Sequence, residues 1–244
     1  MRKAIIVVPC YDEGKRLPID AMKSFMSSNS DIHFCFVNDG SRDNTLDLIK
    51  ELSNDYREQA FYLDLPINYG KAEAVRRGIL NCIEKHKAEL IGYWDADLST
   101  PLWQIDNFLS VFEKNPECVY VSGCRLNRLG ANIKRNPIRH YTGRIFATLV
   151  SQVVSLPVYD SQCGAKIIRS DTAKAIFNKP FISRWAFDVE LIARLKVILR
   201  DDILNNTVIE LPLEEWRNVK GSKIRFTHCI QSLLDLLQIR IHYR

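Results

Sequence analysis

The stretch Leu90-Ile91-Gly92-Tyr93-Trp94-Asp95-Ala96-Asp97-Leu98-Ser99-Thr100-Pro101 decides which fold this sequence predicts. Its first five residues are uncharged and mostly large, which is typical of a buried strand when turn residues follow. Side chains two positions apart in an extended chain point to the same side, so Asp95 and Asp97 are expected to lie side by side at the end of that strand. In isolation, the same pattern also fits a solvated turn.

A metal ion is the expected partner of these two carboxylates. Two carboxylates about 4 Å apart repel each other by roughly 4 kcal/mol at an effective dielectric constant of about 20. A hard divalent ion offsets this repulsion and keeps positions open for phosphate oxygens. We therefore predict that Asp95 and Asp97 bind Mg²⁺ or Mn²⁺, and that this ion holds a diphosphate.

Strands alternate with helices on both sides of this stretch. The alternation predicts an α/β fold, with a single doubly wound, mostly parallel sheet flanked by helices. Ligands of such sheets bind beyond the carboxyl ends of the strands. The expected strands are 3–8, 33–37, 61–65, 90–94, 119–122, 165–168 and 208–211, and the expected helices are about 20–27, 45–52, 71–83, 101–114, 137–156, 184–199 and 230–241.

The composition is that of a globular chain, with 244 residues, 46% hydrophobic residues and a net charge of +5. This length suits one large α/β domain or two small ones. The seven cysteines are scattered and form no Cys-x-x-Cys pair, which indicates neither a zinc site nor a disulfide framework and favours a reducing, cytoplasmic setting. We expect no signal peptide and no transmembrane helix, so the protein is predicted to be soluble or to lie on a membrane surface.

Acidic residues follow three of the predicted strands. Asp12 and Glu13 follow the first strand, Asp39 follows the second, and Asp95 and Asp97 follow the fourth. The carboxyl ends of parallel strands meet at one edge of the sheet. A nucleoside lying across this edge would offer its uracil imide and ribose hydroxyls to the carboxylates and its phosphates to the metal.

Several motifs together resemble those of family 2 inverting glycosyltransferases with the GT-A fold. The early motifs are Pro9-Cys10-Tyr11-Asp12-Glu13, Val37-Asn38-Asp39-Gly40-Ser41, Asn68-Tyr69-Gly70-Lys71 and Asp95-Ala96-Asp97. The later motifs are similar to the dolichyl-phosphate glucosyltransferase branch, close to the dolichyl-phosphate mannose synthases. They are Ser122-Gly123-Cys124-Arg125, Asp160-Ser161-Gln162-Cys163-Gly164-Ala165-Lys166, Arg184-Trp185-Ala186-Phe187-Asp188-Val189-Glu190-Leu191, and Trp216 with Gly221-Ser222-Lys223. The resemblance covers nearly the whole chain.

Two departures from the family pattern stand out. Tyr11-Asp12-Glu13 replaces the usual Tyr-Asn-Glu, and Asn38-Asp39 replaces the usual Asp-Asp. The second Asp, which reads the base in the family, is kept as Asp39.

The resemblance implies one GT-A domain, with a nucleotide-sugar half (1–115) and an acceptor half (116–244). It also implies roles for individual residues. The nucleotide-sugar residues would be Pro9, Tyr11, Glu13, Asp39, Lys71 and Asp95. The acceptor and phosphate residues would be Arg125, Gln162, Arg184, Trp185, Asp188 and Lys223, and the catalytic residues would be Asp97, Arg125 and Asp160.

The acceptor half contains an acid-free segment from Cys118 to Tyr159 that carries six basic residues. A helix from Pro137 would present an apolar stripe of Ile138, Tyr141, Ile145, Leu149, Val153 and Leu156. That stripe fits a membrane interface or a contact with the protein core, and both interpretations stay open. The apolar side of the final helix, 230–241, likewise fits either a membrane interface or a contact with the protein core. The basic segment suits a phosphate-bearing acceptor or anionic headgroups, and it has few aromatic residues for stacking bases, so nucleic acid is not an expected partner.

The role of Asp160 depends on the acceptor. A sugar hydroxyl needs a general base, and Asp160 would supply it. A phosphate monoester has a second pKa of about 6 and is mostly an anion at neutral pH. In that case Asp160 would orient its neighbours, and arginines such as Arg125 would hold the phosphate bidentately.

The predicted reaction is an inverting transfer of glucose from UDP-glucose to a polyprenyl or dolichyl phosphate at a membrane surface. Three alternatives remain at this stage: transfer to a saccharide acceptor, a non-catalytic module that binds nucleotide sugars or membranes, and a nucleotidyltransferase, which would release pyrophosphate.

Overall fold

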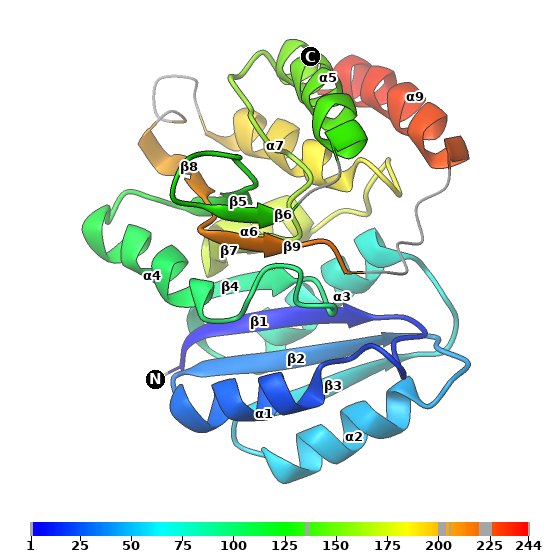
Figure 1. Cartoon of the computed structure of the whole chain (residues 1–244), viewed down its shortest axis with the longest axis vertical. Coiled ribbons are helices and arrows are strands. Elements are labelled where there is room, and N and C mark those ends of the chain that lie inside the picture. The colour runs from blue at the N-terminus through cyan, green and yellow to red at the C-terminus, as the bar shows by residue number, and fades with distance from the viewer. Residues whose placement is uncertain (1, 135–136, 200–203, 205, 220–225, 244) are drawn as a thin grey trace. The chain divides into compact units, whose positions relative to one another are not determined.

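The structure is a computed structural model, and it describes residues 2–134, 137–199, 204, 206–219 and 226–243 (Figure 1). The side chains of residues 2, 137–139 and 226–230 lie outside this description. The chain forms two units that interleave along the sequence. The first unit is Met1–Leu98 with Ala165–Pro180, and the second unit is Ser99–Gly164 with Phe181–Arg244. The prediction of a single domain divided between residues 115 and 116 stays a prediction.

Five strands form the sheet of the first unit, in the order β3-β2-β1-β4-β7. β1 pairs in parallel with β2 and β4, β2 pairs in parallel with β3, and β7 runs antiparallel to β4. All eight residues of β2 are buried, as expected for a central strand. The bounds are β1 Arg2–Cys10, β2 Ile32–Asp39, β3 Ala60–Leu65, β4 Ala88–Trp94 and β7 Ala165–Arg169.

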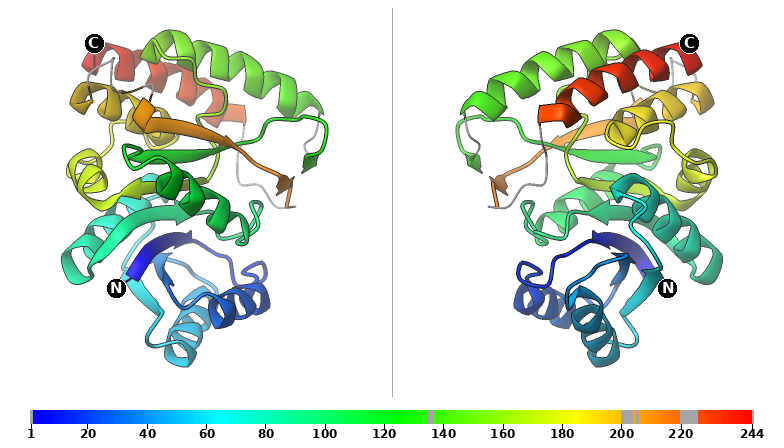
Figure 2. Two further views of the ribbon diagram at one scale, coloured as in Figure 1. Left: turned by 90° about the vertical axis from the view of Figure 1, so that its left-hand side faces the viewer. Right: turned by 90° about the vertical axis from the view of Figure 1, so that its right-hand side faces the viewer.

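Helices of the first unit flank this sheet. α1 (Ile19–Ser28) and α3 (Lys71–Lys85) lie on opposite sides of the strands, and α2 (Thr45–Asp55) packs on β2 and β3 (Figures 1 and 2). α6 (Ser170–Phe177) packs on β4, β7 and α3. The alternation of strands and helices, and the predicted mostly parallel α/β sheet, are confirmed.

Gly40 forms the tight turn that follows β2. Gly40 has φ +64°, in the left-handed region that favours glycine. A Cβ there would lie 2.4 Å from the backbone carbon of Ile67, so the turn after β2 also needs the absence of a side chain.

The second unit pairs β5 (Tyr120–Cys124) with β8 (Val208–Pro212) in parallel. A second parallel pair is formed by β6 (Asn132–Lys134), which follows β5 in the sequence, and β9 (Glu215–Arg217), which follows β8. The sequence analysis predicted neither of these two strands. The helices are α4 (Gln104–Lys114), α5 (Pro137–Val154), α7 (Phe187–Ile198) and α9 (Phe226–His242).

The start of α4 was predicted wrongly. The pattern placed it at Pro101, but the helix begins at Gln104. The preceding residues form tight turns, in which the Gln104 N–H donates to the Pro101 carbonyl and the Ile105 N–H donates to the Leu102 carbonyl. Proline suits a first helical turn, but it is equally common in a turn that precedes one.

Helices α5, α7 and α9 share one hydrophobic core. It contains Val150 and Val154 of α5, Val189 and Ile192 of α7, and Leu236 and Ile239 of α9, each less than 9% exposed. The described helices include none with the length and hydropathy needed to cross a membrane.

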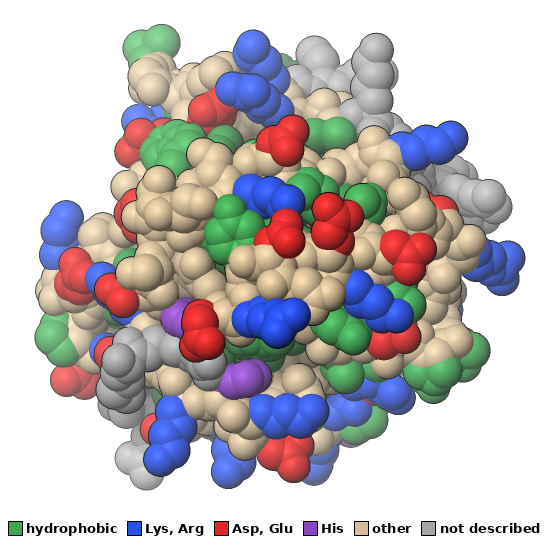
Figure 3. Space-filling model, turned by 90° about the horizontal axis from the view of Figure 1, so that it is seen from below, with side chains coloured by type: hydrophobic (Ala, Val, Ile, Leu, Met, Phe, Trp, Pro, Cys, Tyr) green, Lys and Arg blue, Asp and Glu red, His purple; other side chains and the backbone are tan. Residues whose placement is uncertain are grey.

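The described cysteines lie in the interior, and charged side chains of both signs lie on the surface. The six cysteines that the structure describes are buried thiols (10, 35, 82, 118, 124 and 163). Cys229 lies outside the described side chains. In the face shown in Figure 3, Lys and Arg side chains are interspersed with Asp and Glu side chains, in keeping with the small net charge.

Candidate functional site

Asp95 and Asp97 lie directly after β4, as predicted. The strand ends at Trp94, and the turn that follows is closed by a hydrogen bond from the Leu98 N–H to the Asp95 carbonyl (3.1 Å). Both carboxylates are partly exposed, while Ala96 between them is buried. The turn therefore presents two acidic side chains at the carboxyl edge of the sheet of the first unit.

Lys71, at the first position of α3, meets this pair. Its Nζ lies 2.6 Å from Oδ1 of Asp95, and the two side chains are 39% and 37% exposed. An ion pair this exposed contributes little to stability, about 0–1 kcal/mol. Lys71 therefore places a cationic side chain beside Asp95, and the predicted metal ion stays a prediction.

The donor atoms of Asp95 and Asp97 fit a divalent ion. Both supply hard carboxylate oxygens, and Mg²⁺ is usually bound through one or two carboxylates together with phosphate oxygens and water. Within the described residues, no group of three or more His, Cys, Asp or Glu side chains is arranged to hold a metal. The pair matches the pattern in which a substrate diphosphate supplies the remaining ligands.

Asp39 is buried at the end of β2, with 2% of its surface exposed. Its two carboxylate oxygens accept the backbone N–H groups of Tyr69 and Gly70, each at 2.8 Å. These groups precede α3, so Asp39 fixes the start of the helix that carries Lys71. The predicted contact with a base stays a prediction.

Replacing Asp39 with Asn is expected to destabilise the protein by about 1–3 kcal/mol, because the amide NH₂ would face a buried backbone N–H and leave it without an acceptor. Urea denaturation measures this as a lower midpoint at an unchanged m-value. Asp31→Asn is the matched control, because Asp31 is exposed and lies just before β2. Equal midpoints for the two variants would contradict the anchoring role of Asp39.

The first polar loop is held by its own hydrogen bonds. Asp12 has φ +47°, its carboxylate accepts the Arg42 N–H (2.8 Å), and its N–H donates to Oγ of Ser41 (3.1 Å). Asn and Asp adopt the left-handed region more readily than other residues with side chains. This explains physically why Asp12 can stand where the family usually has Asn.

The remaining nucleotide-sugar residues lie at the same strand end. Glu13 is buried, its carboxylate pairs with Arg16 (2.5 Å), and its N–H donates to Oγ1 of Thr45. Pro9 lies in β1 and Tyr11 directly after it, and both are partly exposed. The first unit therefore brings all six predicted nucleotide-sugar residues to the ends of β1, β2 and β4 and the start of α3.

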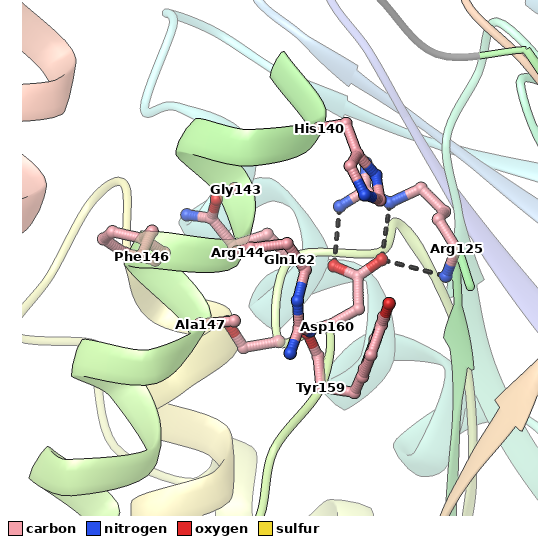
Figure 4. A pocket seen from close by; sticks show the side chains of 10 residues that line it. Arg125, His140, Gly143, Arg144, Phe146, Ala147, Tyr159, Asp160 and Gln162 are labelled. Atoms are coloured by element: carbon pink, nitrogen blue, oxygen red, sulfur yellow. Dashed lines mark hydrogen bonds and ion pairs between the residues drawn. The ribbon is translucent and has the colours of Figure 1, made fainter. Parts of the chain in front are cut away.

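Arg125 and Asp160 form a bidentate pair in the second unit (Figure 4). Nε of Arg125 lies 2.6 Å from Oδ2 of Asp160, and Nη2 lies 2.7 Å from Oδ1. The Arg125 backbone N–H also donates to Oδ2 (3.0 Å). The side chains are 14% and 9% exposed. Both oxygens of Asp160 thus accept hydrogen bonds from Arg125.

A small pocket surrounds this pair (Figure 4). Its volume of about 20 Å³ is enough for about one water molecule. Gln162, predicted as an acceptor residue, lies on its wall. Arg144 does too, with its guanidinium 3.6 Å from the centre of the Tyr159 ring and an Nη1 hydrogen bond to the Tyr159 carbonyl (2.9 Å). The remaining wall residues include His140, Gly143 and Ala147 of α5.

Glu210 is a supporting residue that the sequence analysis did not find. Its carboxylate, on β8, accepts the backbone N–H groups of Tyr159 and Asp160, each at 2.7 Å. It therefore fixes the loop that carries Asp160. No local pattern marks Glu210, because its two partners are about fifty residues earlier in the chain.

Burial and nearby carboxylates raise the pKa values of two side chains of β5, Tyr120 and Cys124. Burial raises the pKa of the Tyr120 hydroxyl well above its usual value, and the charge of Asp188 raises it further. Burial also raises the pKa of the Cys124 thiol, with added effects of Glu210 and Asp160. Cys124 therefore stays a thiol at neutral pH and is not a candidate nucleophile.

The structure places only some of the acceptor residues predicted near α7. Asp188 is buried in the first turn of α7, while Arg184 is exposed and Trp185 partly exposed in the preceding loop. Lys223 lies outside the described residues. Trp216 is buried in β9, and the Arg125 guanidinium lies 5.4 Å from the centre of its ring.

Glu190 has a structural role. It is fully buried and accepts hydrogen bonds from Arg194 (2.7 Å), the Tyr243 hydroxyl (2.8 Å) and the Ile182 N–H (2.8 Å). These contacts join α7 to the residue that follows α9.

This chain is similar in sequence to proteins of a known family. The model of glycosyl transferase family 2 matches residues 5–177. Dolichyl-phosphate beta-glucosyltransferase ALG5A of Trichomonas vaginalis is 31% identical over 98% of this chain and 73% of its own length. Dolichyl-phosphate beta-glucosyltransferase of Homo sapiens is 30% identical over 98% of this chain and 75% of its own length.

Similarity to a solved structure gives information on the fold of this chain and on no other property. Glucosyl-3-phosphoglycerate synthase of Mycobacterium tuberculosis, in complex with Mn²⁺, UDP-glucose and phosphoglyceric acid, has a TM-score of 0.64 at 14% identity, over 98% of this chain and 80% of that chain. This likeness confirms the predicted GT-A fold.

Proposed function

The chain belongs to glycosyl transferase family 2, and from that premise we propose that it transfers glucose from UDP-glucose to a polyprenyl or dolichyl phosphate with inversion at the anomeric carbon. The names of its relatives support this acceptor, since both are dolichyl-phosphate beta-glucosyltransferases. UDP-glucose is the donor bound by the mycobacterial synthase.

The observation that carries the proposal is the bidentate pair of Arg125 and Asp160. A general base needs an oxygen that can take up a proton from the acceptor. Both oxygens of Asp160 already accept charge-assisted hydrogen bonds from a nearly buried guanidinium. Asp160 is thereby suited to orient Arg125 rather than to remove a proton. A phosphate monoester needs no deprotonation at neutral pH, whereas a sugar hydroxyl does.

Arg125 is the proposed phosphate-binding residue of the acceptor site. Its guanidinium lines the pocket and is held in place by its two side-chain hydrogen bonds to Asp160, and a planar guanidinium suits the binding of a phosphate. Arg144 and Gln162, on the same wall, provide further donors toward the pocket. Arg184, Trp185, Asp188 and Lys223 remain proposed acceptor residues by resemblance.

The first unit is the proposed donor site. We assign Asp97, with Asp95, to Mg²⁺ or Mn²⁺, and Lys71 to the diphosphate. A metal bound there stabilises the negative charge that develops on the leaving UDP. Asp39 would bind the base, as the resemblance implies, and Pro9, Tyr11 and Glu13 would line the nucleoside.

The test is an assay with purified protein, Mg²⁺ or Mn²⁺, radiolabelled UDP-glucose and polyprenyl phosphate in detergent. We expect label in the organic extract and release of one UDP per sugar transferred. The matched control is the corresponding polyprenol, which lacks the phosphate and should accept no label. Label in the aqueous phase with a saccharide acceptor, pyrophosphate release, or UDP-glucose binding without turnover would each contradict the proposal.

A further inference from the structure

Two helices of the second unit expose large apolar side chains. On α5, Tyr141, Ile145 and Leu149 recur at every fourth residue, and Tyr141 and Ile145 are 69% and 65% exposed. On α9, four apolar side chains are between 45% and 80% exposed. These are Leu233, Leu234, Leu237 and Ile241. We call these seven side chains the outer apolar face.

The exposed side chains point away from the core. α5 and α9 lie side by side, and each packs on α7 (Figures 1 and 2). The core contacts come from other positions, such as Val150 and Val154 on α5 and Leu236 and Ile239 on α9. The sequence analysis left open whether the stripe of α5 packs inward. Tyr141, Ile145 and Leu149 of that stripe are exposed, while Val153 and Leu156, at and just beyond the end of the helix, pack against the core. Ile138 lies outside the described side chains.

The charges on these helices are almost all basic. α5 contains no Asp or Glu, and the only acidic residue of α9 is Asp235. Asp235 is 3% exposed and accepts hydrogen bonds from Ser183 and Gln231. Arg240 on α9 and Lys134 just before α5 are exposed. An apolar surface with basic and no exposed acidic side chains complements a bilayer that contains anionic lipids.

α5 also joins this face to the pocket. His140, Gly143, Arg144 and Ala147 lie within two turns of α5 and line the pocket around Asp160. Tyr141 and Ile145 are the neighbours in sequence of these wall residues, and they lie on the adjoining side of the same helix. An acceptor whose phosphate meets Arg125 and Arg144 could therefore have its hydrocarbon chain leave along α5 toward the outer apolar face.

We propose that the outer apolar face of α5 and α9 rests on a bilayer surface that contains anionic lipids and presents the pocket to a lipid-linked phosphate. The proposal rests on the proposed function for the identity of the acceptor, but the bilayer contact can be measured without any acceptor.

The test is flotation with vesicles of phosphatidylcholine containing phosphatidylglycerol and no polyprenyl phosphate. We expect the wild-type chain to bind, and the variant Leu237→Ser/Ile241→Ser to bind at least tenfold more weakly. Ile145→Ser/Leu149→Ser should behave in the same way. The matched control is Tyr62→Ser/Ile67→Ser, which removes two exposed apolar side chains of the first unit, 43% and 59% exposed, and should bind like wild type.

Two further measurements complete the design. Vesicles of phosphatidylcholine alone, or 0.5 M salt, should weaken wild-type binding several-fold, because the basic residues lose their partners or are screened. The α9 variant, Leu237→Ser/Ile241→Ser, lies off the proposed path of the acceptor chain along α5, so it should keep wild-type transfer to acceptor in detergent and lose it when the acceptor is embedded in vesicles. Failure of transfer under all conditions would contradict the proposed function and leave the flotation result standing.

Two outcomes would overturn the bilayer proposal. One is wild-type flotation that the α5 and α9 variants do not weaken. The other is a wild-type dimer that these variants convert to monomer without any vesicle binding, which would assign the face to a second copy of the chain. Urea denaturation of each variant, with midpoints close to wild type, separates a binding loss from unfolding.

Discussion

Replacing Asp97 with Asn is expected to lower turnover about a hundred- to a thousandfold while leaving the fold intact. Removing one group that stabilises charge in a transition state costs about 2.7–4 kcal/mol, and each 1.36 kcal/mol is about a factor of ten in rate. The amide has almost the same shape as the carboxylate but lacks the negative charge that a divalent ion requires. Asp97 is partly exposed at the turn after β4, so the change removes no core contact.

Two measurements check the Asp97 prediction. Steady-state rates of UDP release give the loss in turnover, and electron paramagnetic resonance of Mn²⁺ gives the metal affinity, which should fall in parallel. Asp31→Asn, an exposed acid before β2 at the opposite edge of the sheet, should match wild type in both. Near-normal turnover in Asp97→Asn would overturn the metal assignment.

Replacing Asp160 with Asn is expected to lower kcat/KM for the acceptor about ten- to a hundredfold, since losing a hydrogen bond to a charged group costs about 1.5–3 kcal/mol. The amide keeps one acceptor oxygen for Arg125 and gives up the second bond of the pair. KM for UDP-glucose should stay close to wild type, because the proposed donor residues belong to the first unit.

The pH profile of this variant separates positioning from base catalysis. A phosphate acceptor becomes a dianion as the pH rises through about 6, so kcat/KM for the acceptor should rise there in wild type. In Asp160→Asn the rise should persist at a lower level, because the titrating group is the acceptor. If Asp160 were the general base, the variant would lose the rise. Asp106→Asn, an exposed acid of the second unit, is the control and should leave rate and profile unchanged.

The first unit could be predicted well because its signals are local. A buried run that ends in a turn predicted β4, and Asp95 and Asp97 follow it at two-residue spacing. Parallel pairing of β1 with β2 and β4 then brings the carboxyl ends of these strands, including Asp39, to one edge of the sheet. Lys71, at the start of α3, pairs with Asp95 at this edge. The sequence did not show that Asp39 anchors the backbone before α3, because its hydrogen-bond partners are thirty residues away.

The second unit was less predictable, because its signals depend on contacts between distant residues. The pattern marked Arg125 and Asp160 separately, and only the tertiary structure paired them across 35 positions. Periodicity found the apolar stripe of α5 but could not say which side meets the core, since α7 and α9 decide that from elsewhere in the chain. Glu210 carried no local signal at all.

By itself, the sequence determined the α/β class, most element positions, and the acids that follow β1, β2 and β4. These depend on hydrophobic spacing and turn residues within short stretches of chain. Only the tertiary structure decided which carboxylate accepts a guanidinium and which apolar stripe faces outward. Ion pairing and burial require that residues far apart in the sequence come within a few ångströms of each other, and the packing of the helices and strands of each unit settles that.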